Sequence, residues 1–367
     1  MGRLRNGSAW LRATSVRLMT AGVVCWVAAH GARAEAQELG PHDILLLHSY
    51  HPGYTWTDDV TDGIRQALTE LAPSVEVYVE YMDAKRYRYA DYLEQLVEIY
   101  TLKYAHRPFD LIIACDDAAI EFAFEHDARI FGGAPVVFCG TAHPERYRER
   151  AGQPLRGVAE RWSVEGNAAL MQRLFPDLSQ VIVVGSDTLT NSINGASVKQ
   201  RLQAALPEVA VRMHFGSAFE GLQPLVQQRR GTTALLHLGI FRDPDGRWHS
   251  VAEASQRLAN AVNAPIFAVV DNFVTPEVVG GVVVDSQAHG RLAAQLALAT
   301  LRDPALTAER IFESTPSKTL VHHAALERWQ VNRARLPDEA ALLGAPVSFF
   351  EEHREPLFWG GVALVLL

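Results

Sequence analysis

Polar and aromatic side chains follow the first strongly apolar segment of the chain. Residues 44–47 form a short, continuously apolar run, which predicts a strand buried on both faces. Ser49, Tyr50 and Trp56 come next, around a Pro-Gly pair that predicts a turn. Because ligands of open α/β sheets lie beyond the carboxyl ends of the strands, we expect this loop to form one wall of a binding site. The alternative is a capped strand-to-helix connection with surface aromatic residues.

The same type of chemistry recurs where later apolar strands are predicted to end. The residues at these ends are small or can form hydrogen bonds: Asp116 and Asp117, Gly140 and Thr141, Asp187 and Thr188, and Asp271 and Asn272. Each pair alone is also typical of a helix cap, but their repetition predicts one solute-binding cleft. In that cleft Tyr50 and Trp56 would stack on or enclose the ligand, and the carboxylates would accept hydrogen bonds or pair with an amine.

Strand and helix patterns alternate along most of the chain, and a charged connection at residues 145–154 divides them into two series. Such alternation predicts an α/β fold with two lobes, each a parallel sheet flanked by helices. We expect residues 35–142 and 281–302 to form the first lobe and residues 143–280 to form the second.

The two ends of the chain predict export and contact with a membrane. Residues 1–34 combine arginines, an apolar run and an Ala-x-Ala site, the pattern of a secretory signal peptide, with an uncleaved anchor as the alternative. We expect residues 303–353 to form a crossing and juxtamembrane segment. Residues 354–367 would begin a transmembrane helix, the alternative being a buried C-terminal helix. The predicted location is the periplasm, with a tether to the inner membrane.

Composition and spacing exclude several other classes of function. The net charge of −8 comes without a basic stripe, so we expect no nucleic-acid partner. Adjacent Asp116 and Asp117 point in different directions, and His322-His323 has no further ligands at zinc-like spacing. We therefore predict no enzyme activity, no metal and no cofactor. Cys115 and Cys139 are expected to be two buried thiols, the alternative being a single bond between them.

The chain from residue 43 onward resembles the extracytoplasmic ABC-transporter-substrate-binding-like sensor domain of bacterial membrane histidine kinases and diguanylate cyclases. The similar segments are LLLHSYHPGYTWTDDVTDGIRQAL, DLIIACDDAAIEFAFEHDARIFGGAPVVFCGT, VIVVGSDT, TPEVVGGVVVD and LVHHAALERWQVNRARLPDEAALLGAPVSFFEEH.

This resemblance implies a type I periplasmic-binding-protein fold, with three crossing segments and a small-molecule solute between two lobes. It also implies a sensor region that passes lobe closure to a membrane helix and to a cytoplasmic kinase or cyclase module in a longer receptor. The family's signalling module does not occur in the present chain. The alternative is a soluble solute-binding protein that delivers its cargo to an ABC permease.

Overall fold

The computed structural model describes residues 39–186, 189–216, 219–226, 232–240, 247–303, 308–313 and 315–346. The described residues from Pro41 onward belong to one compact unit. The expected signal peptide and the expected start of a transmembrane helix both lie outside the described residues. Within the described part of the chain, no helix combines the length and the apolar character that crossing a bilayer requires.

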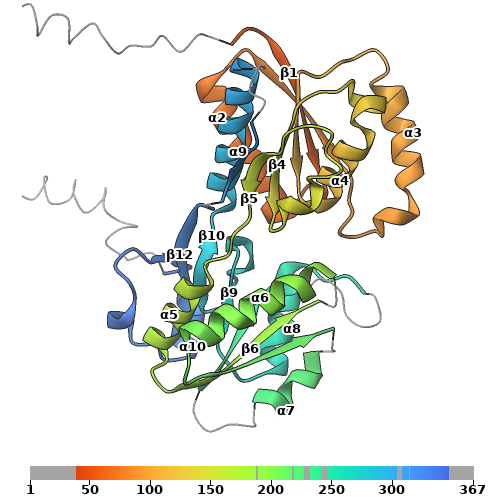
Figure 1. Ribbon diagram of the computed structural model, residues 1–367. Helices are drawn as coiled ribbons and strands as arrows, with labels where there is room; N and C mark the ends of the chain where they lie inside the picture. The colour runs from red at the N-terminus through yellow and green to blue at the C-terminus, as the bar shows by residue number, and fades with distance from the viewer. Residues whose placement is uncertain are drawn as a thin grey trace, which may run out of the picture. The chain divides into compact units, whose positions relative to one another are not determined.

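The first lobe is built on a sheet in which every neighbouring pair of strands is parallel (Figure 1). Its spatial order is β11 (Arg310–Phe312), β5 (Arg156–Ala159), β4 (Val136–Thr141), β3 (Leu111–Cys115), β1 (His42–His48) and β2 (Val75–Tyr81). The central strands are continuously apolar because helices cover both faces. The half-buried β2 lies at the edge of the sheet.

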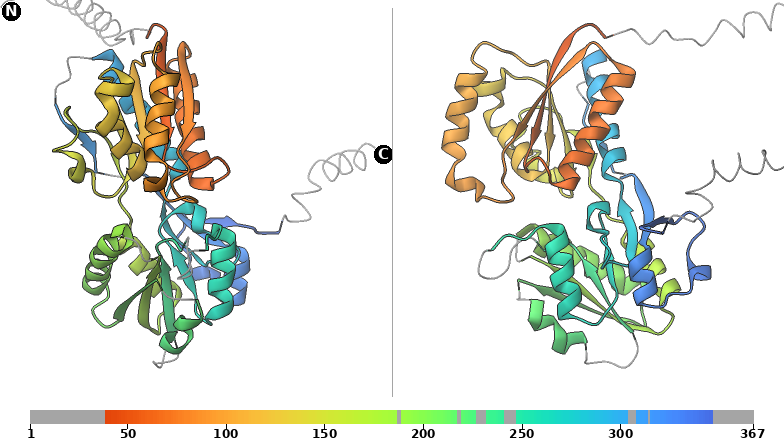
Figure 2. Two further views of the ribbon diagram at one scale, coloured as in Figure 1. Left: turned by 90° about the vertical axis from the view of Figure 1, so that its right-hand side faces the viewer. Right: turned by 180° about the vertical axis from the view of Figure 1, so that it is seen from behind.

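Four helices and three short turns surround this sheet in the described residues. They are α2 (Thr55–Leu71), η1 (Tyr89–Asp91), α3 (Leu93–Lys103), α4 (Asp117–His126), the π-helical turn η2 (Asp127–Phe131), η3 (Pro144–Tyr147) and α9 (Ser286–Arg302). Helices α2 and α9 lie side by side although they are far apart in the sequence (Figure 2). A Cβ on Gly63 would lie 2.0 Å from the Gln287 carbonyl oxygen, and a Cβ on Gly290 would lie 2.2 Å from that of Val60. Only glycine permits this close approach at both positions.

The second lobe has a sheet that is parallel except for one antiparallel pair, β10 with β12. Its order is β13 (Ala341–Leu343), β12 (Ser317–His322), β10 (Gly280–Val284), β9 (Ile266–Ala268), β8 (Thr232–His237), β6 (Leu178–Gly185) and β7 (Ala210–Phe215). The other elements of this part of the chain are α5 (Val164–Leu174), α6 (Leu189–Ala205), η4 (Phe219–Leu222), α7 (Gln223–Val226), α8 (Val251–Ala261), η5 (Asp271–Phe273), α10 (His323–Arg328) and η6 (Arg333–Arg335). Two largely parallel sheets flanked by helices confirm the predicted fold class.

The chain passes between the two sheets three times, after β5, after β10 and after β11. This topology corrects the lobe boundaries expected from the sequence. The charged residues 145–154 do not join the lobes, because the chain then returns to the first sheet as β5. That strand is only four residues long and begins with Arg156, so it gave no clear strand pattern. Gly280–Val284 belongs to the second sheet, and the expected crossing segment 303–353 supplies strands to both sheets.

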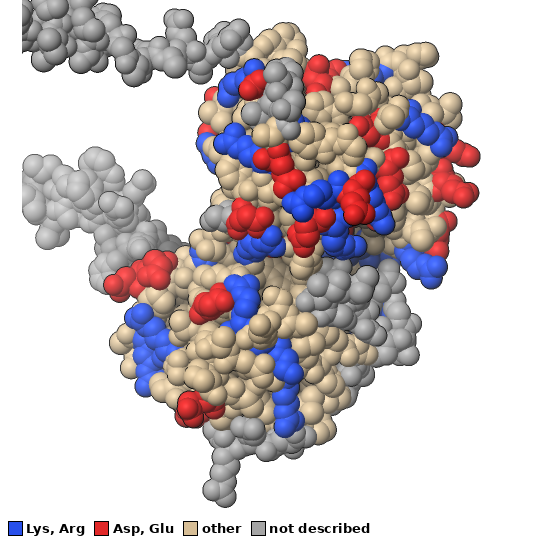
Figure 3. All heavy atoms as spheres, viewed as in Figure 1, with Lys and Arg blue, Asp and Glu red and all other residues tan. Residues whose placement is uncertain are grey.

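Positively and negatively charged side chains are mixed on the upper part of the face shown in Figure 3. Arg148 binds Glu309 at 2.7 Å, next to β11, and Arg150 binds Glu121 of α4 at 2.6 Å. These exposed pairs tie the segment around η3 to its neighbours, each with a small effect on stability. Mixed charge on this face differs from the single-sign basic stripe that nucleic-acid binding requires.

Candidate functional site

Five side chains meet beyond the carboxyl ends of the first sheet's strands. Tyr50 follows β1, Lys85 follows β2, Asp116 follows β3 and Glu160 follows β5, while Tyr54 is the N-cap residue of α2. We call these five residues the Lys85 cluster. Their mutual contacts bring two aromatic rings, one ammonium group and two carboxyl groups together at the edge where α/β folds bind ligands.

Backbone hydrogen bonds position Lys85 above the aromatic rings. Past the end of β2, the Met82 N–H donates to the carbonyl of His48, the last residue of β1, at 2.8 Å, and the Ala84 N–H donates to that of Ser49 at 2.7 Å. Between them Asp83 adopts a left-handed conformation with φ 59°, which turns the chain. Nζ of Lys85 consequently lies 3.9 Å from the ring centroid of Tyr50 and 4.0 Å from that of Tyr54. The two rings are almost perpendicular, at 88°, and form a corner around the ammonium.

Burial shifts the protonation equilibria of both Lys85 and Glu160. It lowers the pKa of Lys85 to about 7, although the neighbouring carboxylates of Asp116 and Glu160 act in the opposite direction. Burial also raises the pKa of Glu160 to about 7, against a hydrogen bond of 2.6 Å that Nε1 of Trp162 donates to it. Both groups therefore titrate near neutral pH, which is typical of functional sites.

Asp116 is the most deeply buried carboxyl group of the cluster, with 3% of its surface exposed. Its φ of 69° is unusual for a residue with a side chain, and Oδ2 has no hydrogen-bond partner among the described residues. Trp56 is also buried and donates a hydrogen bond of 3.1 Å from Nε1 to Oδ1. Burial raises the pKa of Asp116 well above its usual range, and the nearby Lys85 opposes this rise. Trp56 thus serves as a hydrogen-bond donor to Asp116.

The remaining predicted residues of the first lobe support this cluster. Ser49 is buried, donates to the Cys115 carbonyl at 2.9 Å and accepts a hydrogen bond from the first turn of α4. Asp117 accepts a hydrogen bond of 2.7 Å from Thr141. Gly140 has φ 74°, and a Cβ there would lie 2.7 Å from the Asp116 carboxylate. Glycine at this position therefore leaves room for Asp116.

The second lobe contributes Asp271 and Asn272 from η5. The Asp271 carboxylate accepts a hydrogen bond of 2.9 Å from the Ser286 hydroxyl and forms an ion pair of 2.9 Å with Lys318. Asn272 lies beside Tyr54, and its buried amide nitrogen and oxygen have no well-formed hydrogen-bond partner in the described chain. Asp271 is thus held at the crossing between the lobes, while Asn272 faces the Lys85 cluster. The predicted residues Asp187 and Thr188 lie outside the described residues.

Two further contacts join the lobes near the cluster. Nε2 of His143 lies 2.7 Å from Oδ1 of Asn194 in α6, and the rings of His51 and Trp248 meet edge to face with centroids 6.0 Å apart. The contacts connect the loops that follow β1 and β4 to the second lobe, so a change in the distance between the lobes must break or remake them.

Sequence reasoning missed Lys85 and Glu160 as site residues. Lys85 comes four residues after the end of β2, beyond the positions that we considered as strand ends. Glu160 follows β5, whose short sequence was not recognised as a strand; its N–H donates to the Thr141 carbonyl at 2.8 Å. The sequence around Glu160 has no hydrophobic periodicity that would predict a strand ending there.

The cysteines and the histidine pair that the sequence analysis considered do not form a binding site in the described residues. Cys115 and Cys139 are buried free thiols on paired strands, with their sulfur atoms 2.6 Å apart, in agreement with the preferred prediction. His322 and His323 form the junction between β12 and α10. In the described residues, no group of three or more His, Cys, Asp or Glu side chains could hold a metal ion.

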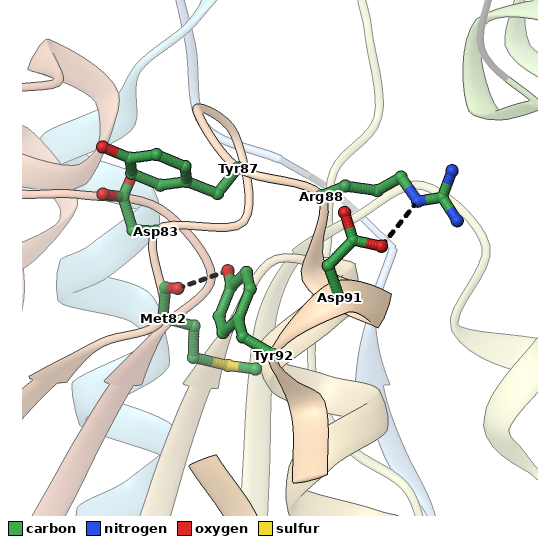
Figure 4. A pocket seen from close by; sticks show the side chains of 6 residues that line it. All are labelled: Met82, Asp83, Tyr87, Arg88, Asp91 and Tyr92. Atoms are coloured by element: carbon green, nitrogen blue, oxygen red, sulfur yellow. Dashed lines mark hydrogen bonds and ion pairs between the residues drawn. The ribbon is translucent and has the colours of Figure 1, made fainter. Parts of the chain in front are cut away.

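A separate hollow of about 400 Å³ lies beside the loop that carries Lys85 (Figure 4). The residues that line it are Met82, Asp83, Tyr87, Arg88, Asp91 and Tyr92. The Tyr92 hydroxyl donates to the Met82 carbonyl at 2.6 Å, and Arg88 pairs with Asp91 at 3.1 Å. None of the predicted site residues contributes to this hollow.

No family model matches the sequence, and no curated protein sequence matches it either. Solved structures do share its fold. An ABC domain from Streptococcus pneumoniae in complex with L-Trp has a TM-score of 0.58 and 15% identity, over 82% of this chain and 99% of that chain. A ligand-free, open substrate-binding protein with adhesive properties from Clostridium difficile has a TM-score of 0.60 and 12% identity, over 83% and 100% of the two chains.

A periplasmic ribose ABC transporter protein from Conexibacter woesei is also similar, with a TM-score of 0.53 and 12% identity over 80% of this chain and 96% of that chain. At such low identities, the comparisons establish the fold alone. The fold is the two-lobed architecture of type I periplasmic-binding-like proteins, which these three structures share.

Proposed function

We propose that this chain is a periplasmic solute-binding module that holds a small molecule between its lobes without altering it. The observation that carries the proposal is the Lys85 cluster, which faces Asn272 of the other lobe. Buried polar atoms are normally paired, yet Oδ2 of Asp116 has no hydrogen-bond partner in the described chain, and the Asn272 amide has only its interaction with Tyr54. A bound solute would supply partners to both lobes at once.

Binding would favour a closed arrangement because the ligand contacts both lobes only in that state. The crossing after β10 is the natural point of movement. There the Ser286 hydroxyl lies 3.2 Å from Asp59 of α2 and 2.9 Å from Asp271 of η5, so one side chain touches both lobes. Closure would rearrange this contact and the pair of His143 with Asn194.

The proposed role is the sensor region of a membrane signalling receptor, in which closure passes to a membrane helix and then to a kinase or cyclase module. The sequence resemblance to such sensor domains supports this role. The second candidate is delivery of the solute to an ABC permease, which the ABC substrate-binding structures favour. Fractionation of cells that express the natural gene product separates the two: a receptor is recovered with the inner membrane, and a delivery protein with the periplasmic extract.

A thermal-shift screen with a broad panel of metabolites tests solute binding itself. A ligand that binds only the folded protein raises its melting temperature, and the rise grows with the logarithm of the ligand concentration once the site is nearly saturated. We expect at least one compound to stabilise the wild type and to lose this effect in Glu160→Gln. Glu98→Gln, an exposed change on α3, should behave like the wild type. A complete panel without any stabilising compound would refute the proposal.

A further inference from the structure

An internal cation already occupies the aromatic corner of the site. The Lys85 ammonium lies about equally close to the rings of Tyr50 and Tyr54, at 3.9 and 4.0 Å. Two perpendicular rings that face one positive charge form the beginning of an aromatic cage, which is the arrangement that recognises organic ammonium ligands. The residue as a whole is half-buried, and burial is the largest influence on the pKa of its ammonium.

The carboxyl groups around this corner outnumber the ammonium. Asp116, Asp117 and Glu160 all act electrostatically within the cluster, against the single positive charge of Lys85. Oδ2 of Asp116 is buried and has no hydrogen-bond partner in the described chain, although a carboxylate normally accepts several. The site therefore has capacity for one more donor that carries positive charge.

We infer that the ligand is a small organic cation, a primary amine or quaternary ammonium compound, whose nitrogen lies against Tyr50 and Tyr54 and faces the carboxyl groups. This inference rests on the proposed function and specifies its ligand. Lys85 holds the same position in the free protein and is displaced on binding. Its flexible four-carbon chain permits this movement, since β2 and the backbone of Ala84 stay fixed by their hydrogen bonds to β1 and its loop.

Binding of a cation should strengthen as pH rises from about 6 to about 8. The cationic ligand prefers ionised Glu160 and uncharged Lys85, and both groups lose their protons near pH 7. Asp116, Asp117 and Asp271 also face these two groups, while Trp162 donates to Glu160. An alkylamine stays protonated across this range, so its own charge does not change.

Calorimetric titration with sets of compounds that share a carbon skeleton tests the inference. One set is 2-phenylethylamine, phenylacetate and 2-phenylethanol. Further sets combine an amine, an acid and an alcohol on one aliphatic skeleton. We expect the amine of at least one set to bind about tenfold more tightly than its acid and alcohol, the size of a charged hydrogen bond. Preferential binding of acids or alcohols would overturn the inference but leave the proposed function standing. Failure of every compound, together with an inactive metabolite panel, would overturn both.

Two variants sharpen the test. Lys85→Met removes the internal competitor and should tighten amine binding about tenfold, whereas a site for anions would lose binding. Glu160→Gln should weaken amine binding about tenfold and reduce its pH dependence, with Glu98→Gln as the control. Unchanged or weaker amine binding in folded Lys85→Met contradicts the inference. If that variant does not fold, an unchanged affinity in Glu160→Gln contradicts it instead.

Discussion

The indole nitrogen of Trp56 donates a hydrogen bond of 3.1 Å to the carboxylate of Asp116. This contact joins the first turn of α2 to the end of β3, and both residues are buried. Asp116 itself has a left-handed backbone conformation that residues with a side chain rarely adopt. Trp56, which the sequence predicts to stack on or enclose the ligand, thus donates a hydrogen bond to a carboxyl group of the site.

Replacement of Trp56 by Phe should destabilise the protein by about 1–3 kcal/mol, because it leaves a buried carboxylate oxygen without its donor. Urea unfolding measures this change. Trp329→Phe is the matched control, since its buried indole nitrogen has no hydrogen-bond partner in the described residues. We expect that control to cost less than about 1 kcal/mol. Equal losses in the two variants would show that the hydrogen bond is not responsible.

Gly140→Ala should destabilise the protein more than Gly132→Ala. Both glycines have a left-handed φ, 74° and 67°, which costs a residue with a side chain about 1–2 kcal/mol. A Cβ on Gly132 meets nothing within 4 Å, whereas one on Gly140 lies 2.7 Å from the Asp116 carboxylate. The additional cost at Gly140 should be about 1–3 kcal/mol, as for overpacking. Thermal unfolding of both variants measures it, and equal melting temperatures would rule out the clash.

Glu160→Gln should become more stable relative to the wild type as pH rises. The pKa of Glu160 is about 7 in the folded protein against a usual value of 4.5, so the folded state retains a proton that the unfolded state loses. The contribution of Glu160 to the free energy of unfolding is therefore fully present below pH 4.5 and is lost as pH rises to about 7. Glutamine does not titrate, so the variant should not show this loss. Urea unfolding from about pH 5 to about pH 8, with Glu98→Gln as reference, tests this sign. A parallel decline in all three proteins would refute it.

Lys318→Met should destabilise the crossing between the lobes by about 1–3 kcal/mol, since it leaves Asp271 without its counter-charge. Lys318 pairs with Asp271 at 2.9 Å, and the side chain of Asp271 is only 8% exposed. Arg291→Met breaks the exposed pair with Glu70 and should cost clearly less, because solvent screens exposed ion pairs. Chemical unfolding compares the two. A larger loss in Arg291→Met would contradict this ranking.

The alternation of apolar runs was sufficient to predict the fold class, because parallel strands covered on both faces must be continuously apolar. The expectation that ligands bind beyond the carboxyl ends of the strands likewise predicted that Tyr50, Asp116 and Asn272 lie near one another. The lobe boundaries were harder to predict, because β5 and β11 are short strands near the sheet edge. The sheet to which each of them belongs depends on pairing between residues far apart in the sequence. No local pattern in the sequence encodes that pairing.

The roles of individual side chains within the site also could not be predicted from the sequence. Whether an aromatic residue faces a ligand or supports a neighbour depends on packing, as Trp56 illustrates with only 5% of its surface exposed. Lys85 enters the site only because Asp83 turns the chain after β2. Such a left-handed turn at a non-glycine residue follows from tertiary hydrogen bonds and leaves no motif.

The most direct test of the central claim is whether one ligand contacts both lobes. Titration calorimetry of a stabilising compound should show that Glu160→Gln in the first lobe and Asn272→Ala in the second each weaken binding about tenfold or more. The exposed substitutions Glu98→Gln and Gln203→Ala, one in each lobe, should leave the affinity unchanged. If only one of the two variants Glu160→Gln and Asn272→Ala binds more weakly, or neither does, the result would contradict a solute site between the lobes.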